Sequence, residues 1–382
     1  MKITAVVAHP VSMPLETTFW TAHESMSTSS VILVEVQTDQ GISGVGQIHA
    51  GPMPEVCKWV ERLGEVAIGM DPRAHTDVWD RLFALTCPRP GSIPAREGVI
   101  APLPRSARPA IMAAIAGIDI AVWDIKGKAA GQPVYRLLGG VNRPVYIYAT
   151  GGFYRADRGP NDCAQELAGF VEAGYKGVKL KCGGLTMDEE VARIAATREA
   201  IGPDTLFMLD MNAPYALDDC ITFARRVEPY GIHWLEEPLH WYLQPADFVK
   251  LAAATPIPLA HGERELTRFT VRDFIASGAI RFVQFDSTRA AGFTESVRIA
   301  HLAEQFGVRI APHQVPELHA HLCAAFPDAS FGAETGGNPR RNPVWHGMYL
   351  DRAKIENSYV HLNDKPGFGV EIDWTFVARH KA

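Results

Sequence analysis

The sequence lacks the features by which several large classes of protein are recognised. Its six cysteines are scattered without CxxC spacing, which argues against a zinc site of thiolates and against a disulfide framework. The N-terminal segment MKITAVVAHPVSM has no apolar signal core, and no apolar run approaches the length of a membrane span. We therefore expect a protein of the reducing cytoplasm, without a membrane partner.

An excess of charge of one sign is also missing. Lys plus Arg number 37 and Asp plus Glu number 43, and there is no long basic run, so we expect no nucleic-acid partner. Hydrophobic residues make up 47% and charged residues 21%, which is the balance of a folded globular protein. A small molecule is the expected partner. The length of 382 residues predicts two domains, or one barrel with an appended domain.

The N-terminal third predicts an α+β domain. Residues 1–50 alternate between apolar and polar as strands do, and VILVEVQTD, a turn and ISGVGQIHA indicate an antiparallel meander. Apolar residues at helical spacing follow in residues 54–85 and 108–138. We assign residues 1–140 to this capping domain. The tail, residues 349–382, predicts turns and short strands, and we expect it to pack back on the cap.

From Val145 onward, short apolar runs ending in polar residues alternate with amphipathic segments, which predicts eight strands and seven intervening helices. Repeated βα units favour a parallel sheet, and eight of them favour a closed TIM-like (β/α)8 barrel. The GxGxxG turn of dinucleotide-binding folds is missing after the first strand. Because no eighth helix is evident, we expect a modified barrel, in residues 141–348. The expected strands are VYIYATG, GVKLKCG, LFMLDMN, IHWLEEP, IPLAHGE, IRFVQFDS, VRIAPHQ and ASFGAET.

Three acidic residues follow consecutive strands of this expected barrel. Asp210, Glu236 and Glu263 are separated by 26 (236 − 210) and 27 (263 − 236) residues, so they should converge at the C-terminal edge, where such barrels place their sites. Three like charges raise one another's pKa unless a cation neutralises them. Oxygen ligands without cysteine favour Mg²⁺ over zinc. The simpler reading, in which such acids cap helices or pair with arginines, is less favoured for three acids in register.

Two further pairs of residues have the pattern of general acids and bases. Lys179 and Lys181 alternate on one strand, so both point into the barrel, where a neighbouring ammonium and a metal would lower a lysine's pKa. His313 follows Asp286 by 27 residues (313 − 286), which places the two on neighbouring strands. A carboxylate on one ring nitrogen raises the basicity of the other. The simpler readings are lysines satisfied by carboxylates and a structural histidine.

The motifs VKLKC, LDMN, WLEEP, HGE, QFD, APH and GAE, together with GIDIAVWDIKGKAAGQPVYRLLGG and PGFGVEI, resemble the mandelate racemase branch of the enolase superfamily. The resemblance covers nearly the whole chain. It implies a homo-oligomer, from dimer to octamer, and it implies that the first acid of EEP, not Glu237, binds metal. The implied roles are Mg²⁺ ligands for Asp210, Glu236 and Glu263; opposite acid/base groups for Lys181 and His313; supporting positions for Lys179 and Asp286; and hydrogen-bond donation to the substrate carboxylate for Glu334.

The chain departs from the family pattern at positions that bear on the substrate. Phe285 stands where a proline usually precedes the Asp of the His–Asp pair, and STRAAG replaces a Gly-rich stretch, which places Arg289 near the pocket. Asn212 occupies the position at which galactonate and some mannonate dehydratases carry an active histidine. We therefore expect Asn212 and Arg289 to contact the substrate, and we disfavour those two substrates.

The N-terminal loop expected at residues 14–26 should also help to choose the substrate. It contains Phe19, Trp20 and His23. Large aromatic side chains at this place either cap the barrel mouth and exclude water or only pack between domains.

The chemistry implied by the resemblance begins with the proton alpha to a carboxylate. Its removal builds a second negative charge, which Mg²⁺, Lys179 and a protonated Glu334 would stabilise. Acid/base groups on both faces favour dehydration of an acid sugar or hydroxy acid to a 2-keto-3-deoxy acid. A racemase, epimerase or lactone cycloisomerase is the alternative, and the motifs leave the individual substrate open.

Two classes without this chemistry are less favoured. A non-catalytic ligand-binding paralogue would be expected to have lost a metal ligand or an acid/base residue, and none is lost. A zinc hydrolase barrel needs histidine ligands at strand ends, and only His313 and His261 could serve. We expect His261 to face the barrel interior, one layer below Glu263, as a core residue.

Overall fold

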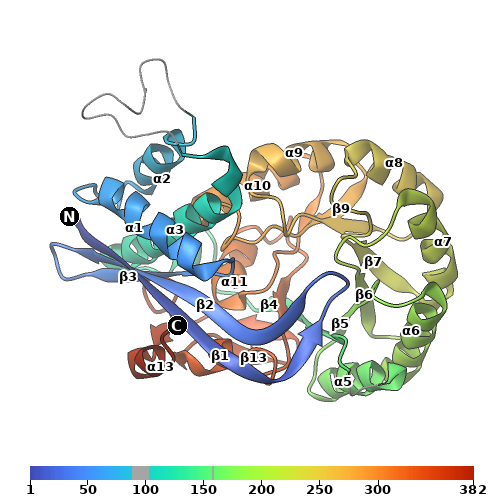
Figure 1. The fold of residues 1–382 in the computed structure, drawn as a ribbon. Coiled ribbons are helices and arrows are strands. Elements are labelled where there is room, and N and C mark those ends of the chain that lie inside the picture. The colour runs from blue at the N-terminus through green and yellow to red at the C-terminus, as the bar shows by residue number, and fades with distance from the viewer. Residues whose placement is uncertain (88–102, 157–158) are drawn as a thin grey trace.

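A computed structural model describes residues 1–87, 103–156 and 159–382. A three-stranded sheet and several helices form a cap beside a ring of parallel strands, and the helices that connect those strands surround the ring (Figure 1). No helix in the described ranges is both long and apolar enough to cross a membrane.

The cap sheet is the antiparallel meander that the alternation predicted. The strand β1 (Ile3–Trp20) pairs along its length with β2 (Ser25–Thr38), which in turn pairs with β3 (Ser43–Ile48). The expectation of a loop at residues 14–26 is wrong, because β1 and β2 continue into this segment and only residues 21–24 form the turn. The pairing of β1 with β2 has a register shift between Pro14 and Phe19. In Figure 1 this hairpin extends across the ring toward β5 (Gly177–Lys181).

The long helix α3 (Arg108–Ala130) is the core of the cap, and its residues from 110 to 125 are buried. Two glycines of β3 let the sheet lie directly on this helix. A Cβ atom at Gly46 would collide with the backbone oxygen of Gly117, and one at Gly44 with that of Ala121. The remaining cap helices are α1 (Met53–Ala67), α2 (His75–Ala84), the 3-10 turn η1 (Arg105–Ala107) and α4 (Val134–Leu137).

Hydrogen bonds tie the cap to the ring through α10 (Phe293–Gln305). The Asp119 carboxylate of α3 accepts the backbone N–H of Thr294 at 2.8 Å, and the indole N–H of Trp123 donates to the Thr294 hydroxyl at 2.8 Å. Burial raises the pKa of Asp119 to about 7. The orientation of the cap on the ring is thereby fixed by buried polar contacts as well as by apolar packing.

The eight strands and seven intervening helices predicted from the repeated pattern are confirmed. Parallel pairing runs without interruption from β4 to β10, and β11 pairs with β4. Ile310 of β10 also exchanges backbone hydrogen bonds of 2.8 Å with Ala329 and Phe331, just before β11, so the strands form a ring. The elements are β4 (Val145–Gly151), α5 (Pro160–Glu172), β5, α6 (Met187–Ile201), β6 (Leu206–Asp210), α7 (Leu217–Val227), η2 (Glu228–Tyr230), β7 (Ile232–Glu236), α8 (Pro245–Ala254), β8 (Leu259–His261), α9 (Arg268–Ala276), β9 (Ile280–Val283), α10, β10 (Arg309–Ile310), α11 (Pro316–Ala325) and β11 (Ala333–Thr335).

Apolar side chains fill the interior of the ring below the C-terminal ends of its strands. The Tyr148 ring of β4 and the Trp234 ring of β7 lie 5.3 Å apart, although two strands separate them in the sheet, so they meet across the interior. Phe282 of β9 lies 4.8 Å from Trp234 and completes this aromatic floor. Polar side chains occupy the layer above it, at the C-terminal ends of the strands, as is usual for barrel enzymes.

The segment after β11 differs from the other βα units. It contains only the short helix α12 (Pro343–Gly347) and then a tail that contacts both cap and ring. In the tail, β14 pairs antiparallel with β4, and the N–H of Ala382 donates to the carbonyl of Pro10 at 3.0 Å. The division of the chain at residues 140 and 348 stays a prediction. The tail elements are β12 (Tyr349–Asp351), β13 (Lys354–Glu356), β14 (Tyr359–His361), β15 (Glu371–Ile372) and α13 (Trp374–Arg379).

Candidate active site

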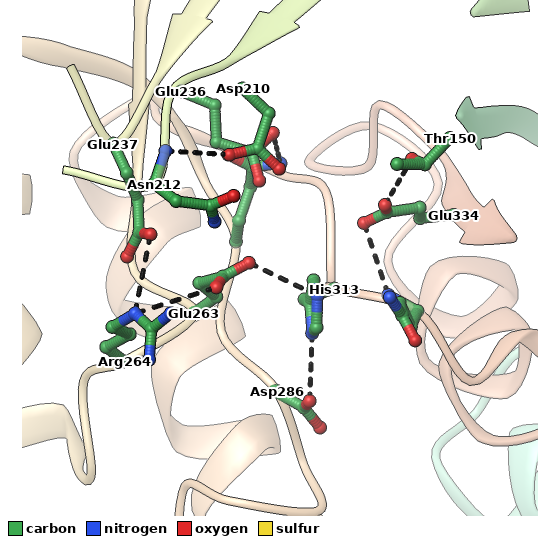
Figure 2. Close-up of polar contacts among 12 residues, drawn as sticks. Thr150, Asp210, Asn212, Glu236, Glu237, Glu263, Arg264, Asp286, His313 and Glu334 are labelled. Atoms are coloured by element: carbon green, nitrogen blue, oxygen red, sulfur yellow. Dashed lines mark hydrogen bonds and ion pairs between the residues drawn. The ribbon is translucent and has the colours of Figure 1, made fainter. Parts of the chain in front are cut away.

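Three consecutive strand ends bring carboxylates together, as the 26- and 27-residue spacing predicted (Figure 2). Asp210 ends β6, Glu236 ends β7 and Glu263 follows β8. Each offers an oxygen atom, and these three atoms lie within 4.8 Å of one another. All three side chains are buried. We call Asp210, Glu236 and Glu263 the carboxylate triad.

Glu263 enters the site through a break in the strand alternation. Ala260 of β8 faces the ring interior. His261, two residues before Glu263, faces outward against Phe274 of α9, with ring centroids 4.2 Å apart. The expectation that His261 faces inward is therefore wrong. Gly262 has a φ of +134°, a conformation that favours glycine, and this turn directs Glu263 inward three residues after Ala260.

Lys179 is completely buried within a group of carboxylates. Its Nζ lies 2.7 and 2.8 Å from the two Glu236 oxygens and 3.0 Å from Glu334 Oε1. Burial alone would lower the pKa of Lys179, but Glu236, Glu334 and Asp210 together raise it well above the usual value. These carboxylates therefore favour the charged ammonium form of Lys179.

Lys181 points to the same face of β5, as the alternation predicted. Its Nζ donates to the Asp210 carboxylate and, at 3.0 Å, to the Asn212 amide oxygen. Asn212 itself has a left-handed backbone with a φ of 52° just after β6, and the structure thus places it beside Lys181. The Lys181 Nζ lies 5.5 Å from the centre of the Phe153 ring, at the edge of the cavity described below.

Glu334 belongs to β11, the last strand of the ring, and lies beside Lys179. It accepts hydrogen bonds from the Thr150 hydroxyl and, at 3.3 Å, from the backbone N–H of Gln314. Burial would raise the pKa of Glu334, but the charges of Lys179 and His313 bring it below the usual value. The adjacent ammonium thus stabilises the carboxylate form of Glu334, and its protonation when a substrate carboxylate is bound stays a prediction.

The electrostatics of the carboxylate triad suit a hard cation. Burial and the charge of Asp210 raise the pKa of Glu236 well above its usual value. Glu263 Oε2 is buried and accepts no aligned hydrogen bond from the described residues, although His313 Nε2 lies 3.2 Å away. Buried anions that repel one another and leave a lone pair unused are the environment that a divalent ion with oxygen ligands satisfies. Glu237 lies outside the triad, its pKa raised to about 8 mainly by burial.

His313 and Asp286 form the contact expected from their spacing. His313 Nδ1 lies 2.9 Å from Asp286 Oδ2, and His313 Nε2 lies 3.2 Å from Glu263 Oε2 (Figure 2). Asp286 also accepts the N–H and hydroxyl of Thr288 at 2.8 and 2.7 Å. Burial would raise the pKa of Asp286, but the hydrogen bond from His313 and the charge of Arg289 hold it far below the usual range. We call His313 and Asp286 the dyad.

A cavity of about 290 Å³ opens between the cap and the strand ends, and Lys181, Glu263 and His313 lie in its wall. Asn212 and Arg289 line it as well, as expected for residues that contact a substrate. Arg289 is held there by a 2.9 Å hydrogen bond from its Nε to the carbonyl of His49. The cavity therefore brings the two candidate acid/base groups, Lys181 and His313, to one space.

The hairpin of β1 and β2 covers this cavity, but the aromatic residues expected to do so do not line it. The Phe19 ring packs on Phe153 at 6.5 Å, Trp20 pairs with the backbone of Tyr154, and His23 Nε2 lies 3.0 Å from the carbonyl of Ala213. Phe19, Trp20 and His23 thus attach the hairpin to the ring. The residues near the hairpin tip that reach the cavity are Leu15, Thr21, Glu24, Met26 and Thr28, and Ser29–Ile32 of β2 line it as well.

Two arginines of the cavity wall were not found from the sequence. Arg264 Nη1 lies 3.4 Å from Glu24 of the hairpin, and its Nε lies 3.6 Å from Glu237. Its position directly after Glu263 is a signal that could have identified it. Arg341 lies in an irregular segment between β11 and α12, where no periodicity predicts which side chains turn inward.

Comparison with known proteins assigns the family. Residues 162–376 match the model of the enolase C-terminal domain-like family, and residues 2–139 match the N-terminal domain of mandelate racemase and muconate lactonizing enzyme. The chain belongs to the mandelate racemase and muconate lactonizing enzyme family. The resemblance found in the strand-end motifs is confirmed.

Members of this family that resemble the chain include enzymes of two kinds. A D-galactarolactone cycloisomerase of Agrobacterium fabrum is 34% identical over 98% of this chain and 97% of the relative. A D-galactonate dehydratase of Variovorax paradoxus is 33% identical over 90% of this chain and 88% of the relative. The crystal structure of L-talarate/galactarate dehydratase from Salmonella typhimurium, liganded with Mg and L-lyxarohydroxamate, is 26% identical with a TM-score of 0.85, covering 100% of this chain and 93% of that chain.

Proposed function

We propose that the protein is a Mg²⁺-dependent dehydratase of an acid sugar, which removes the proton alpha to the carboxylate and then water to give a 2-keto-3-deoxy acid. The observation that carries this proposal is the placement of Lys181 and His313 in the wall of one cavity with Glu263, a member of the carboxylate triad. Relatives with dehydratase activity on acid sugars support the same conclusion.

The carboxylate triad is proposed to hold the metal ion. The three oxygen donors within 4.8 Å of one another fit Mg²⁺, and the solved relative from Salmonella is liganded with Mg. When bound, Mg²⁺ would stabilise the second negative charge that develops on the substrate carboxylate as the alpha proton leaves.

Lys181 and His313 are proposed to move the protons. They come from β5 and from the end of β10, which lie on different sides of the triad in the ring. One group takes the alpha proton, and the other protonates the β-hydroxyl, which leaves as water. Asp286 accepts from His313 Nδ1, so Nε2, which lies 3.2 Å from Glu263 Oε2, is the nitrogen proposed to exchange a proton with a ligand.

Lys179 and Glu334 are proposed to receive the substrate carboxylate. Lys179 keeps its positive charge because Glu236 and Glu334 stabilise the ammonium, so it can neutralise charge on the intermediate without giving up a proton. Glu334 must gain a proton before it can donate a hydrogen bond to that carboxylate. The approach of an anionic substrate favours this, because a nearby negative charge raises a carboxyl pKa.

Cycloisomerisation of a sugar lactone is the second candidate. It is favoured by the 34% identity to a D-galactarolactone cycloisomerase over 98% of this chain. The first step is the same in both reactions, since each begins with removal of an alpha proton, and the leaving oxygen then belongs either to a hydroxyl or to the lactone ring. The product distinguishes the two.

A screen of acid sugars and their lactones for 2-keto acid formation tests the proposal. We expect activity to vanish with EDTA and to return with Mg²⁺. Glu236→Gln should lower the affinity for Mg²⁺ by at least about tenfold, since it removes a charged ligand. Glu237→Gln is the matched control, because the neighbouring acid lies outside the triad, and its Mg²⁺ affinity should stay at the wild-type value. Full turnover by thoroughly chelated protein would contradict the proposal.

A further inference from the structure

Arg341 lies in the wall of the active-site cavity. It shares that wall with Lys181 and His313, and its side chain is almost fully buried, with 6% of the residue exposed. The guanidinium carbon stands 4.1 Å from the centre of the Phe153 ring, and Lys181 Nζ stands 5.5 Å from the same ring. The proposed acid/base group and a second buried cation thus lie near the same aromatic ring.

Arg341 has no counter-ion, in contrast to the other arginines of the cavity. Arg264 and Arg289 each lie within 4.0 Å of carboxylates, whereas Arg341 forms no ion pair within that distance with any residue that the structure describes. Its Nε has no hydrogen-bond partner in those residues, and its Nη2 has one contact, 2.9 Å from Asn342, when that amide presents its oxygen. A buried guanidinium without an anion is costly, so such groups are rare unless a ligand completes them.

The electrostatic surroundings agree with this geometry. Burial lowers the pKa of Arg341 to about 10, and the charges of Glu334 and Glu166 offset only part of that effect. At neutral pH the group is still a cation. It therefore presents a positive charge to the cavity that no carboxylate in contact neutralises.

The position of the guanidinium is prepared by its surroundings. Gly336 leaves room for it, since a Cβ atom there would lie 2.8 Å from Arg341 Nη2. The backbone N–H of Arg341 donates to the carbonyl of Asn338 at 3.2 Å, and the segment is joined to the cap by a 3.4 Å bond from the N–H of Val344 to Ser29. The arginine is thus held in place before any ligand arrives.

We propose that Arg341 binds a second anionic group of the substrate, so that the enzyme acts on a dicarboxylic sugar acid, or the lactone of one, in preference to a monocarboxylic acid. This inference rests on the proposed function. The first carboxylate is received by Lys179 and Glu334 at the triad, and the planar fork of Arg341 suits a carboxylate at the far end of the molecule. A neutral hydroxyl there would leave the buried charge uncompensated.

The test compares an aldaric acid with the aldonic acid of the same hydroxyl configuration, by kcat/KM of the Mg²⁺-loaded enzyme. We expect the wild type to favour the diacid by about 10- to 100-fold, the value of a charged hydrogen bond in a buried site. Arg341→Met should remove this preference by lowering the diacid value alone. Arg341→Lys, which keeps the charge but not the fork, should retain part of it.

Two controls separate ligand binding from a structural role. Arg264→Met changes an arginine of the same cavity that pairs with protein carboxylates, and we expect it to leave the ratio of diacid to monoacid unchanged. Without ligand, Arg341→Met should keep or raise the midpoint of thermal unfolding, because it removes a buried charge without a counter-ion. A large fall in that midpoint together with an equal loss for both substrates would overturn the inference.

Binding measurements distinguish this inference from the proposed function. Calorimetric titration of the same two acids into the Mg²⁺-loaded His313→Asn variant should show the preference for the diacid, and adding Arg341→Met should abolish it. If that holds but no acid sugar gives a 2-keto acid with the wild type, dehydration is wrong and the anion site stands. If the wild type dehydrates the monoacid as well as the diacid, or the variant binds neither acid, the anion site is wrong.

Discussion

The Glu263 carboxylate lies between the triad and the dyad. One of its oxygens belongs to the group of three donors within 4.8 Å, and Oε2 is 3.2 Å from His313 Nε2. Burial would raise the pKa of Glu263, but His313, Lys181 and Arg289 hold it far below the usual range. A change at Glu263 should therefore disturb metal binding and proton transfer together, whereas a change at His313 leaves the other two triad members untouched.

The assignment of Lys181 and His313 to the two proton transfers gives a prediction that can be measured by NMR. If Lys181 takes the alpha proton, His313→Asn should stop product formation and still allow the alpha hydrogen to exchange with solvent deuterium. Lys181→Ala should abolish both, because no base then faces that hydrogen. Deuterium in substrate recovered from the reaction is the measurement.

The reverse pattern would assign proton removal to His313, as expected for a substrate of the other configuration at that carbon. Each variant must first be shown to fold and to bind Mg²⁺. If both single variants retained wild-type turnover, this pair would not be the catalytic machinery.

At the scale of elements, the strand ends are the part of the site that the sequence predicted well. Asp210, Glu236 and Glu263 could be found because βα units return every strand end to one edge, and Lys179 and Lys181 because side chains on a strand alternate. These arguments need only the alternation of side chains along a strand and the length of the repeated βα unit.

The parts that the sequence did not predict depend on single backbone turns. The inward direction of Glu263 and the outward direction of His261 follow from the φ of Gly262, which no period reveals. The place of Phe19 follows from the register shift after Pro14, because that shift decides which hairpin residues face the cavity. Arg341 lies in a segment with neither strand nor helix period.

The junction of α11, α4 and the tail gives a prediction about stability and pH. His321 of α11 is fully buried, accepts the backbone N–H of Tyr135 at Nδ1 over 3.2 Å, and has Nε2 3.1 Å from the carbonyl of Phe368. Burial lowers its pKa to about 4, below the value of about 6.5 in an unfolded chain. The unfolded state therefore binds more protons between these pH values, and the free energy of unfolding should fall as the pH is lowered through them.

The expected loss is about 3 kcal/mol in total, with about 2 kcal/mol of it present by pH 5. Urea unfolding at pH 7 and pH 5 measures it. His321→Asn is the comparison, since its amide oxygen can accept the Tyr135 N–H and does not titrate, so the part of the loss due to His321 should disappear. Equal losses in the variant and the wild type would show that other groups control the acid sensitivity.

At the scale of the whole molecule, the oligomeric state is a prediction that measurements in solution can test. Trp241 and Tyr242, in the segment after β7, are 54% and 78% exposed, and the His23 ring of the hairpin lies 4.8 Å from Trp241. Exposed aromatic residues of this kind are enriched in protein interfaces. We expect a homo-oligomer between a dimer and an octamer by multi-angle light scattering, and Trp241→Ser with Tyr242→Ser to lower its mass. A single-chain mass for the wild type at working concentration would contradict the prediction.

The contact of β3 with α3 limits how enzymes of this design can diversify. At Gly46 the strand lies on the backbone of Gly117, and no side chain larger than hydrogen fits between the sheet and the helix there. Ordinary substitution therefore cannot retune the interior of the cap in small steps, since a first added carbon already forces the sheet away. The hairpin tip, where Glu24 and Met26 reach the cavity, has no such restriction. New substrate preferences should thus arise by substitution of a few residues at the hairpin tip, while the β3–α3 contact stays unchanged. Related enzymes with different substrates should therefore share that contact.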